Sequence, residues 1–307
     1  MTTIERGRNA LKPLGTSTQP TAELSRAASA KPVEAKKPQL VADGFESKSA
    51  KAVAAVFTAP AGSPDRVYDG KLVGAGGQTF DASTPLSQVP PFTPRNNPNA
   101  TETAIYINGI STTKDGQAGS LQALADSTGM RTIGIHNATE GMVSDVIQCV
   151  KDKLDKGKNP AVDTLADAVY SELKAGRDVH VMAHSQGGLI TSRALNDVAR
   201  RMRIEDGMSQ ADVEKALNHV KVETFGSAGA TYPDGPQYVH YVNNRDLVPS
   251  VLGLGGSLDP LALLRHPGKG AQVERFSEKT MFTGAHALEA TYLKHRVPFD
   301  QARAGQF

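Results

Sequence analysis

The sequence of 307 residues contains a single cysteine, Cys149. An intramolecular disulfide is therefore impossible, and a cysteine-rich metal site is excluded. Cys149 lies within the apolar stretch 146–150, on one face of a predicted helix. We interpret it as a small buried apolar side chain rather than as a reactive thiol.

Long apolar runs are also missing. No segment approaches the roughly 18 consecutive apolar residues of a membrane-spanning helix. The first residues, 1–8, lack the apolar core of a secretory signal peptide. We therefore expect a protein that is cytoplasmic or that leaves the cell by a route that reads no such signal.

Neither sign of charge predominates, because 34 Lys and Arg stand against 32 Asp and Glu and the formal net charge is +2. This balance gives no reason to expect nucleic acid or an anionic membrane as the main partner. The basic excess is confined to the first 60 residues, which hold nine Lys or Arg and five Asp or Glu.

Residues 1–55 are rich in Ala, Ser, Thr, Pro and Lys and contain almost no aromatics. Such a composition cannot bury enough apolar surface to offset chain entropy, so this region is predicted to be disordered. Two interpretations are open. The region is a tail or linker, or it is an export and delivery segment of the kind found in secreted bacterial effectors.

Residues 56–100 are expected to form an extension or linker. Val67–Tyr68 and Lys71–Val73 could pair as short strands. Gly74–Gly77 is interpreted as a turn, since it lacks the residues that complete a phosphate-binding loop. Four prolines then mark a linker: Pro90, Pro91, Pro94 and Pro98.

Residues 101–307 form the predicted catalytic domain, in which apolar strands alternate with helices. Strands alternating with helices imply crossover connections, hence a mostly parallel sheet covered on both faces. The strands are expected at 104–107, 131–137, 178–184, 220–225, 237–242 and 271–276. The helices are expected at 118–128, 142–154, 162–173, 189–202, 209–218 and 284–293.

The stretch 179–188 combines a predicted strand, a sharp turn at Ser185 and a predicted helix. Strand and helix approach closely at such a turn, so the residues two before and two after the serine must be small. Ala183 and Gly187 meet this requirement. The turn would lift the serine hydroxyl clear of the sheet and point the free N–H groups of the helix N-terminus at a developing negative charge.

These residues resemble the nucleophile elbow of the α/β-hydrolase superfamily. The His-Ser-Gln-Gly-Gly core at 184–188 is similar to the bacterial lipase-like branch of that superfamily. The resemblance covers roughly residues 101–296. It implies an α/β-hydrolase fold and a serine hydrolase with Ser185 as the nucleophile. Ala183 stands where the commonest pattern has glycine.

A serine hydroxyl is a weak nucleophile unless a base takes its proton, and the base needs a third group to orient it. The fold implies the chain order serine, acid, histidine. The acid is expected at Asp246, in a segment similar to the acid loop of lipases, with Asp234 in a Pro-Asp-Gly turn as the alternative. The base is expected at His286, after the last strand, where the following helix with Tyr292 is similar to the lipase pattern.

An oxyanion hole requires two N–H donors. The first is expected from the backbone of Gln186, the residue after the nucleophile. The second is assigned to the backbone of Ile110, because Asn108–Ile110 occupies the place of the family's His-Gly-x segment. Asn108 replaces the family's histidine there.

The apolar, glycine-rich stretch 251–264 lies between the expected acid and base. It is either a lid or acyl-binding wall, or a loop and helix that close the core. In the first case the candidate substrate contacts are Leu252, Leu254 and Leu258. An exposed apolar lid would favour lipid esters over small esters.

The expected reaction is hydrolysis of carboxylic esters through an acyl-enzyme. The substrate would be a small-molecule or lipid ester, with transient contact to a membrane surface as an option. Two alternatives stay open: another acyl-transfer enzyme on the same triad (acyltransferase, thioesterase or peptidase), and a non-catalytic binding module. No cofactor is expected. No metal is expected either, since no two histidines stand at metal-ligand spacing with a carboxylate between them.

Overall fold

The computed structural model describes residues 64–110, 112–138, 159–256, 264–278, 280 and 284–307. All of them belong to one compact unit. The predicted disordered region 1–55, the predicted helix 142–154 with Cys149, and Leu258 lie outside the described residues. Among the residues described, no helix is long and apolar enough to cross a bilayer.

An eight-stranded sheet organises the described residues, in the order β2-β1-β4-β3-β5-β6-β7-β8. The six strands from β3 to β8 are parallel, and β1 and β2 add an antiparallel edge beside β4. The strands are β1 (Leu72–Val73), β2 (Thr79–Phe80), β3 (Thr103–Ile107), β4 (Arg131–Ile135), β5 (Val179–His184), β6 (Val220–Phe225), β7 (Gln237–Asn243) and β8 (Gln272–Phe276). This mostly parallel sheet confirms the predicted fold class and is consistent with the α/β-hydrolase fold.

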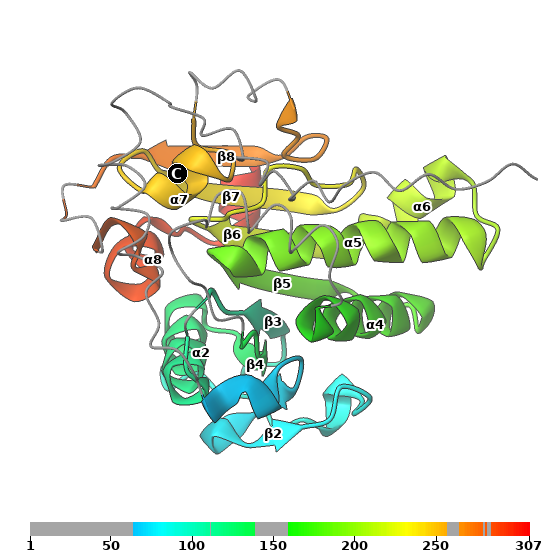
Figure 1. The fold of residues 1–307 in the computed structure, drawn as a ribbon, viewed down its shortest axis with the longest axis horizontal. Helices are drawn as coiled ribbons and strands as arrows, with labels where there is room; N and C mark the ends of the chain where they lie inside the picture. Colours follow the sequence, from blue (N-terminus) through cyan, green and yellow to red (C-terminus); the bar gives the residue numbers. More distant parts are fainter. Residues whose placement is uncertain (1–63, 111, 139–158, 257–263, 279, 281–283) are drawn as a thin grey trace, which may run out of the picture. The chain divides into compact units, whose positions relative to one another are not determined.

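Helices cover both faces of the sheet. Figure 1 shows α4 and α2 on opposite sides of β3 and β4. The longer helices are α2 (Lys114–Thr128), α4 (Pro160–Lys174), α5 (Gln186–Ile204) and α6 (Gln210–Leu217). The shorter helical segments are η1 (Pro64–Tyr68), η2 (Ala75–Gly77), η3 (Leu86–Gln88), α7 (Leu247–Val251), η6 (Gly284–His286), η7 (Leu288–Tyr292), α8 (Leu293–His295) and α9 (Phe299–Arg303).

The two core clusters follow from the alternation of side chains along each strand. In β3, Ile105 and Ile107 belong to the cluster that packs against α4, α5 and α6. Ala104 and Tyr106 belong to the cluster that packs against α2, η7 and α9. Because both faces are buried, the central strands are mostly apolar, and this apolar character is the pattern that predicts a parallel sheet.

Local signals set several helix ends. The predicted stops at Gly129 and Gly176 are confirmed, since both glycines adopt a left-handed backbone, with φ of 72° and 71°. Asn159 caps α4 by accepting hydrogen bonds from the backbone N–H groups of Ala161 and Val162, and Pro160 occupies the first helical position.

Two local predictions were wrong. Val67–Tyr68 does not pair as a strand but lies in η1, and β1 pairs instead with β2, with Leu72 opposite Phe80. The predicted continuous helix 284–293 is broken into η6, η7 and α8, because Ala287 has an extended backbone (φ −71°, ψ 126°). Two-residue strands and single turns are too short for periodicity to reveal them.

The expected linker also contributes structure where it is described. It supplies β1, β2 and Phe92, whose backbone exchanges two hydrogen bonds with Thr132, of 2.9 and 3.0 Å. The predicted turn at Gly74–Gly77 is confirmed, since Gly77 N–H donates to the Gly74 carbonyl.

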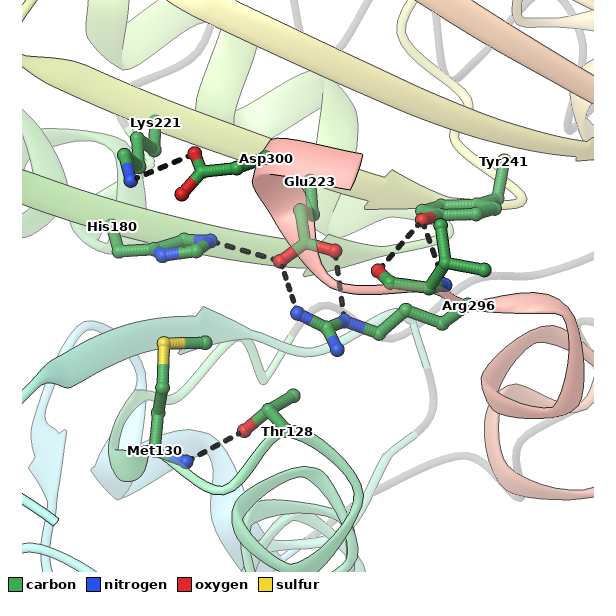
Figure 2. Close-up of polar contacts among 9 residues, drawn as sticks. Thr128, Met130, His180, Lys221, Glu223, Tyr241, Arg296 and Asp300 are labelled. Carbon is green, nitrogen blue, oxygen red and sulfur yellow. Dashed lines mark hydrogen bonds and ion pairs between the residues drawn. The ribbon is translucent and has the colours of Figure 1, made fainter. Parts of the chain in front are cut away.

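A buried ion cluster joins the C-terminal segment to the sheet (Figure 2). Glu223 of β6 has no exposed surface, and its carboxylate accepts two hydrogen bonds from Arg296, of 2.8 and 2.9 Å. His180 of β5 places Nε2 2.9 Å from the same carboxylate. Burial raises the pKa of Glu223, but the hydrogen bond with His180 and the charge of Arg296 outweigh it, so the net pKa lies below the ordinary 4.5.

We expect Glu223→Gln to lower the free energy of unfolding by about 3 kcal/mol at pH 7, because Arg296 would keep a buried charge without its counterion. Glu172→Gln is the matched control. It breaks the Arg177–Glu172 pair, in which the Arg177 side chain is 60% exposed, so solvent screening should make its cost far smaller. Urea unfolding measures both, and equal losses would contradict the prediction.

Comparison of the wild type with Glu223→Gln also tests how the stability depends on pH. Since the folded pKa of Glu223 is lowered, its stabilisation is present above the ordinary value of 4.5 and is lost as the pH falls through the lower folded value. The difference in unfolding free energy between wild type and Glu223→Gln should therefore shrink below about pH 4.5.

Candidate active site

Ser185 forms the turn between β5 and α5. With φ 58° and ψ −123°, it has the one positive φ of any non-glycine residue in the described part of the chain. Such a backbone costs about 1–3 kcal/mol and persists only where the surroundings enforce it. Here the Ser185 N–H donates to the Phe225 carbonyl (3.0 Å), and the Ser185 carbonyl accepts from Ala228 and Gly188, at 2.9 and 3.1 Å.

The small residues around the turn are a steric requirement. Ala183 is fully buried. A Cβ at Gly187 would overlap the carbonyl oxygen of Ile107 in β3, and a Cβ at Gly109 would lie 2.7 Å from Ser185 Cβ. The loop after β3 thus approaches the serine so closely that only a glycine backbone fits at position 109.

Asp246 lies directly after β7 and caps α7. Its Oδ1 accepts a hydrogen bond from the backbone N–H of Val248 (2.9 Å). Its Oδ2 lies 2.6 Å from His286 Nδ1 and also accepts a hydrogen bond from the Tyr292 hydroxyl (2.6 Å). The carboxylate is 1% exposed, so in this low-dielectric setting its charge interacts mainly with these three donors.

His286 comes from η6, after β8, and is buried. Its ring packs on the ring of His184, with 4.7 Å between centroids, and its backbone carbonyl accepts a hydrogen bond from His184 Nε2 (2.8 Å). Burial, and next the neighbouring His286, lower the pKa of His184 to about 3. His184 is therefore neutral at ordinary pH and adds no charge beside His286.

The three predicted residues gather at the carboxyl edge of the sheet. Asp246 and His286 are hydrogen-bonded, and Ser185 directly follows His184, whose ring packs at a tilt on that of His286. The contact between His184 and His286 has no local signal in the sequence, because it joins residues 102 positions apart.

The expected oxyanion donors lie on the two segments that meet at Ser185. Gln186 is the first residue of α5 and is buried, and Ile110 follows Gly109. Asn108 is fully buried: its amide donates to the carbonyls of Gly109 and Asn137, both at 2.8 Å, and accepts from Asn137 N–H (2.8 Å). Asn108 therefore fixes this loop against the segment that follows β4.

A second layer of polar contacts reaches Gln186. The side chain of Asn137 donates to Gln186 Oε1 (2.7 Å), which fixes the first residue of α5 from the segment after β4, two strands away from β5. Asn137 was not singled out from the sequence, since a lone asparagine after a strand has no motif.

An apolar cluster lies beside the same loops. It consists of buried Ala228, Val248 and Leu252 with partly buried Ile110, Leu189, Leu247 and Val251. Of the predicted substrate contacts, Leu252 belongs to this cluster, whereas Leu254 packs into the core on the face covered by α4 and α5. Leu252, and not Leu254, therefore belongs to the cluster against which Ile110 packs.

The alternative acid, Asp234, lies elsewhere. It pairs with His266 (2.7 Å) and accepts a hydrogen bond from the backbone of Lys269 (2.8 Å), just before β7 begins. Within the described ranges, no three His, Cys, Asp or Glu side chains gather in a way that could hold a metal ion.

The sequence and the structure were compared with those of known proteins. No protein-family model matches the sequence, and no curated protein matches it. Among solved structures, lipase B of Aspergillus fumigatus is similar, with a TM-score of 0.36 and 14% identity. The match covers 81% of this chain and 66% of that chain, so this protein spans just under two-thirds of the length of the fungal lipase.

The space around two helical glycines, Gly187 and Gly119, predicts opposite effects on stability when each is replaced by alanine. Gly187→Ala should destabilise the protein and displace Ser185, because the added methyl meets the backbone of Ile107. We expect a loss of about 2–3 kcal/mol in unfolding free energy. Gly119→Ala in α2 has open space around the new methyl and should stabilise by roughly 0.5–1 kcal/mol. Thermal unfolding of both variants measures these changes. A Gly187→Ala variant as stable as the wild type would contradict the close approach of Gly187 to Ile107.

Proposed function

We propose that the protein is a lipase-like serine hydrolase that cleaves carboxylic esters, with Ser185 as nucleophile, His286 as general base and Asp246 as the acid that orients it. The observation that carries the proposal is the 2.6 Å contact of His286 Nδ1 with the buried Asp246 carboxylate. The ring of His286 packs on that of His184, the residue before a serine held with positive φ at a strand-to-helix turn. The strained serine backbone costs folding free energy. A histidine oriented by a buried carboxylate is what activation of a serine hydroxyl requires.

In the proposed reaction, Ser185 Oγ attacks the ester carbonyl carbon while its proton passes to His286 Nε2. Asp246 holds the Nδ1–H of His286 and stabilises the imidazolium that forms. The tetrahedral intermediate then expels the alcohol, which takes the proton from Nε2 and leaves the acyl group on Ser185. Water, deprotonated by His286, attacks the acyl carbon. The bond to Ser185 Oγ then breaks, Oγ takes the proton back from His286 Nε2, and the acid is released.

The backbone N–H groups of Gln186 and Ile110 are proposed to bind the oxyanion. Gln186 begins the 19-residue helix α5, whose N-terminus carries a positive partial charge. What supports Ile110 is the close approach of Gly109 to Ser185. Loss of one such donor costs about 10²–10³ in rate in hydrolases of this kind.

The apolar cluster beside Ile110 supports an ester with an apolar acyl group. Burial of each methylene contributes about 0.8 kcal/mol, or up to about fourfold in kcat/KM. A lipid or phospholipid ester, reached by transient contact with a membrane surface, is the largest substrate of this class that we propose.

Mutation of the three residues tests the mechanism. We expect a fluorophosphonate probe to label the wild type and to fail on Ser185→Ala. Asp246→Asn should lose about 10⁴-fold in kcat through the wrong His286 tautomer. Asp234→Asn is the matched control, since it removes a carboxylate that also pairs with a histidine, and it should keep wild-type activity. Labelling that survives Ser185→Ala, or equal losses in the two aspartate variants, would refute the assignment.

A series of p-nitrophenyl esters tests the acyl specificity. We expect kcat/KM to rise from acetate to octanoate, since longer chains bury more apolar surface beside Leu252 and Ile110. A flat or falling series would reject the apolar acyl site while leaving the triad in place.

A further inference from the structure

The carboxylate of Asp246 is shared by two side chains on its Oδ2 oxygen. His286 Nδ1 and the Tyr292 hydroxyl both lie 2.6 Å from this atom, and Oδ1 is occupied by the backbone N–H of Val248. The oxygen that faces His286 is therefore the one that Tyr292 also binds.

Tyr292 is itself held rigidly. It has no exposed surface, and its ring packs edge-on against Phe276 (5.5 Å between centroids). Its hydroxyl oxygen accepts a hydrogen bond from the backbone N–H of Asn243 (3.4 Å), so the hydroxyl proton is available to Asp246. Tyr292 lies in η7, and this segment is held to η6 by Thr291, whose hydroxyl donates to the Gly284 carbonyl (2.6 Å).

Space for this contact is provided by Gly226, at the end of β6. Gly226 has φ 55°, and a Cβ there would lie 2.8 Å from both Asp246 Oδ2 and the Tyr292 hydroxyl oxygen. Three segments, after β6, after β7 and after β8, thus converge where phenol and carboxylate meet.

We propose that Tyr292 is a positioning residue for the base: its hydroxyl fixes the Asp246 carboxylate and withdraws negative charge from the oxygen used by His286, which sets the pH at which the base becomes active. The inference rests on the proposed function for its catalytic meaning. Tyr292 touches neither substrate nor reacting atoms in this role, since it acts through Asp246.

The surroundings favour this assignment. Burial, and then the charge of Asp246, raise the pKa of Tyr292 far above its ordinary value of 10, so it donates throughout the working pH range. Among the described residues, His286 contacts the Asp246 carboxylate and the ring of neutral His184, and Tyr292 reaches it through Asp246. The Asp246 carboxylate is the charged group among them, and Tyr292 is the side chain that modifies it.

The direction of the effect follows from charge. Without the hydroxyl, Oδ2 carries more negative charge toward His286, and the protonated imidazole is favoured. In Tyr292→Phe the acid limb of the kcat/KM profile should therefore move to higher pH, by about 0.3–1 unit. The plateau should fall about 3–30-fold, because Asp246 loses one of its three orienting donors.

Tyr241→Phe provides the matched control. Tyr241 is also buried, and its hydroxyl bonds to the backbone carbonyl and N–H of Val297, each at 3.3 Å (Figure 2). Both variants lose one buried hydroxyl, so both should lose some stability. The proposal requires that the acid limb shift in Tyr292→Phe alone, in profiles measured from pH 5 to 9 with a soluble ester. An unshifted limb in Tyr292→Phe, or the same shift in both variants, would overturn it.

A second measurement is independent of turnover. In ¹⁵N-histidine-labelled Ser185→Ala, the pH midpoint of the His286 resonances should move upward when Tyr292→Phe is added, and should not move with Tyr241→Phe. If the wild type cleaves no ester but this midpoint moves, the proposed function fails and the positioning role stands. If the wild type is active and the midpoint is unchanged, the positioning role fails by itself.

Discussion

The site depends on a steric constraint, the close passage of β3 and its loop beneath the turn at Ser185. Gly187 lies against the carbonyl of Ile107, and Gly109 lies against Ser185. Any larger side chain at either position would separate strand, helix and loop. This contact holds Ser185 in a backbone conformation that a non-glycine residue avoids, and it aligns the N-terminus of α5 with the space above the serine.

The second half of the site is built from loops that follow other strands of the same sheet. Parallel strands end at one edge, so the segments after β5, β7 and β8 meet there although they are far apart in the chain. Asp246 accepts hydrogen bonds from Val248, in its own segment, and from His286 and Tyr292, which follow β8. A buried carboxylate is stable only when its lone pairs are satisfied in this way, so the polar network and the packing require each other.

The C-terminal segment links this network to the body of the sheet. Tyr292 contacts Asp246, and four residues later Arg296 forms the buried pair with Glu223 on β6. Breaking a pair of this kind is costly because a charge is left in the core. The ion cluster therefore fixes the path of the chain just after the residues that contact Asp246, and Tyr241 adds hydrogen bonds to Val297 next to it.

Periodicity and turn residues were sufficient for the parallel strands, for the helix ends at Gly129 and Gly176, and for the elbow around Ser185, because these features depend on neighbours in the chain. The sequence also singled out Asp246 and His286 through their positions after strands, and the structure joins them by a hydrogen bond. It could not reveal the antiparallel edge of β1 and β2, the break at Ala287, or the contacts of His184, Asn137 and Tyr292. These arise between residues brought together only by the folded sheet, where the available space and the need to pair buried polar groups decide the partners.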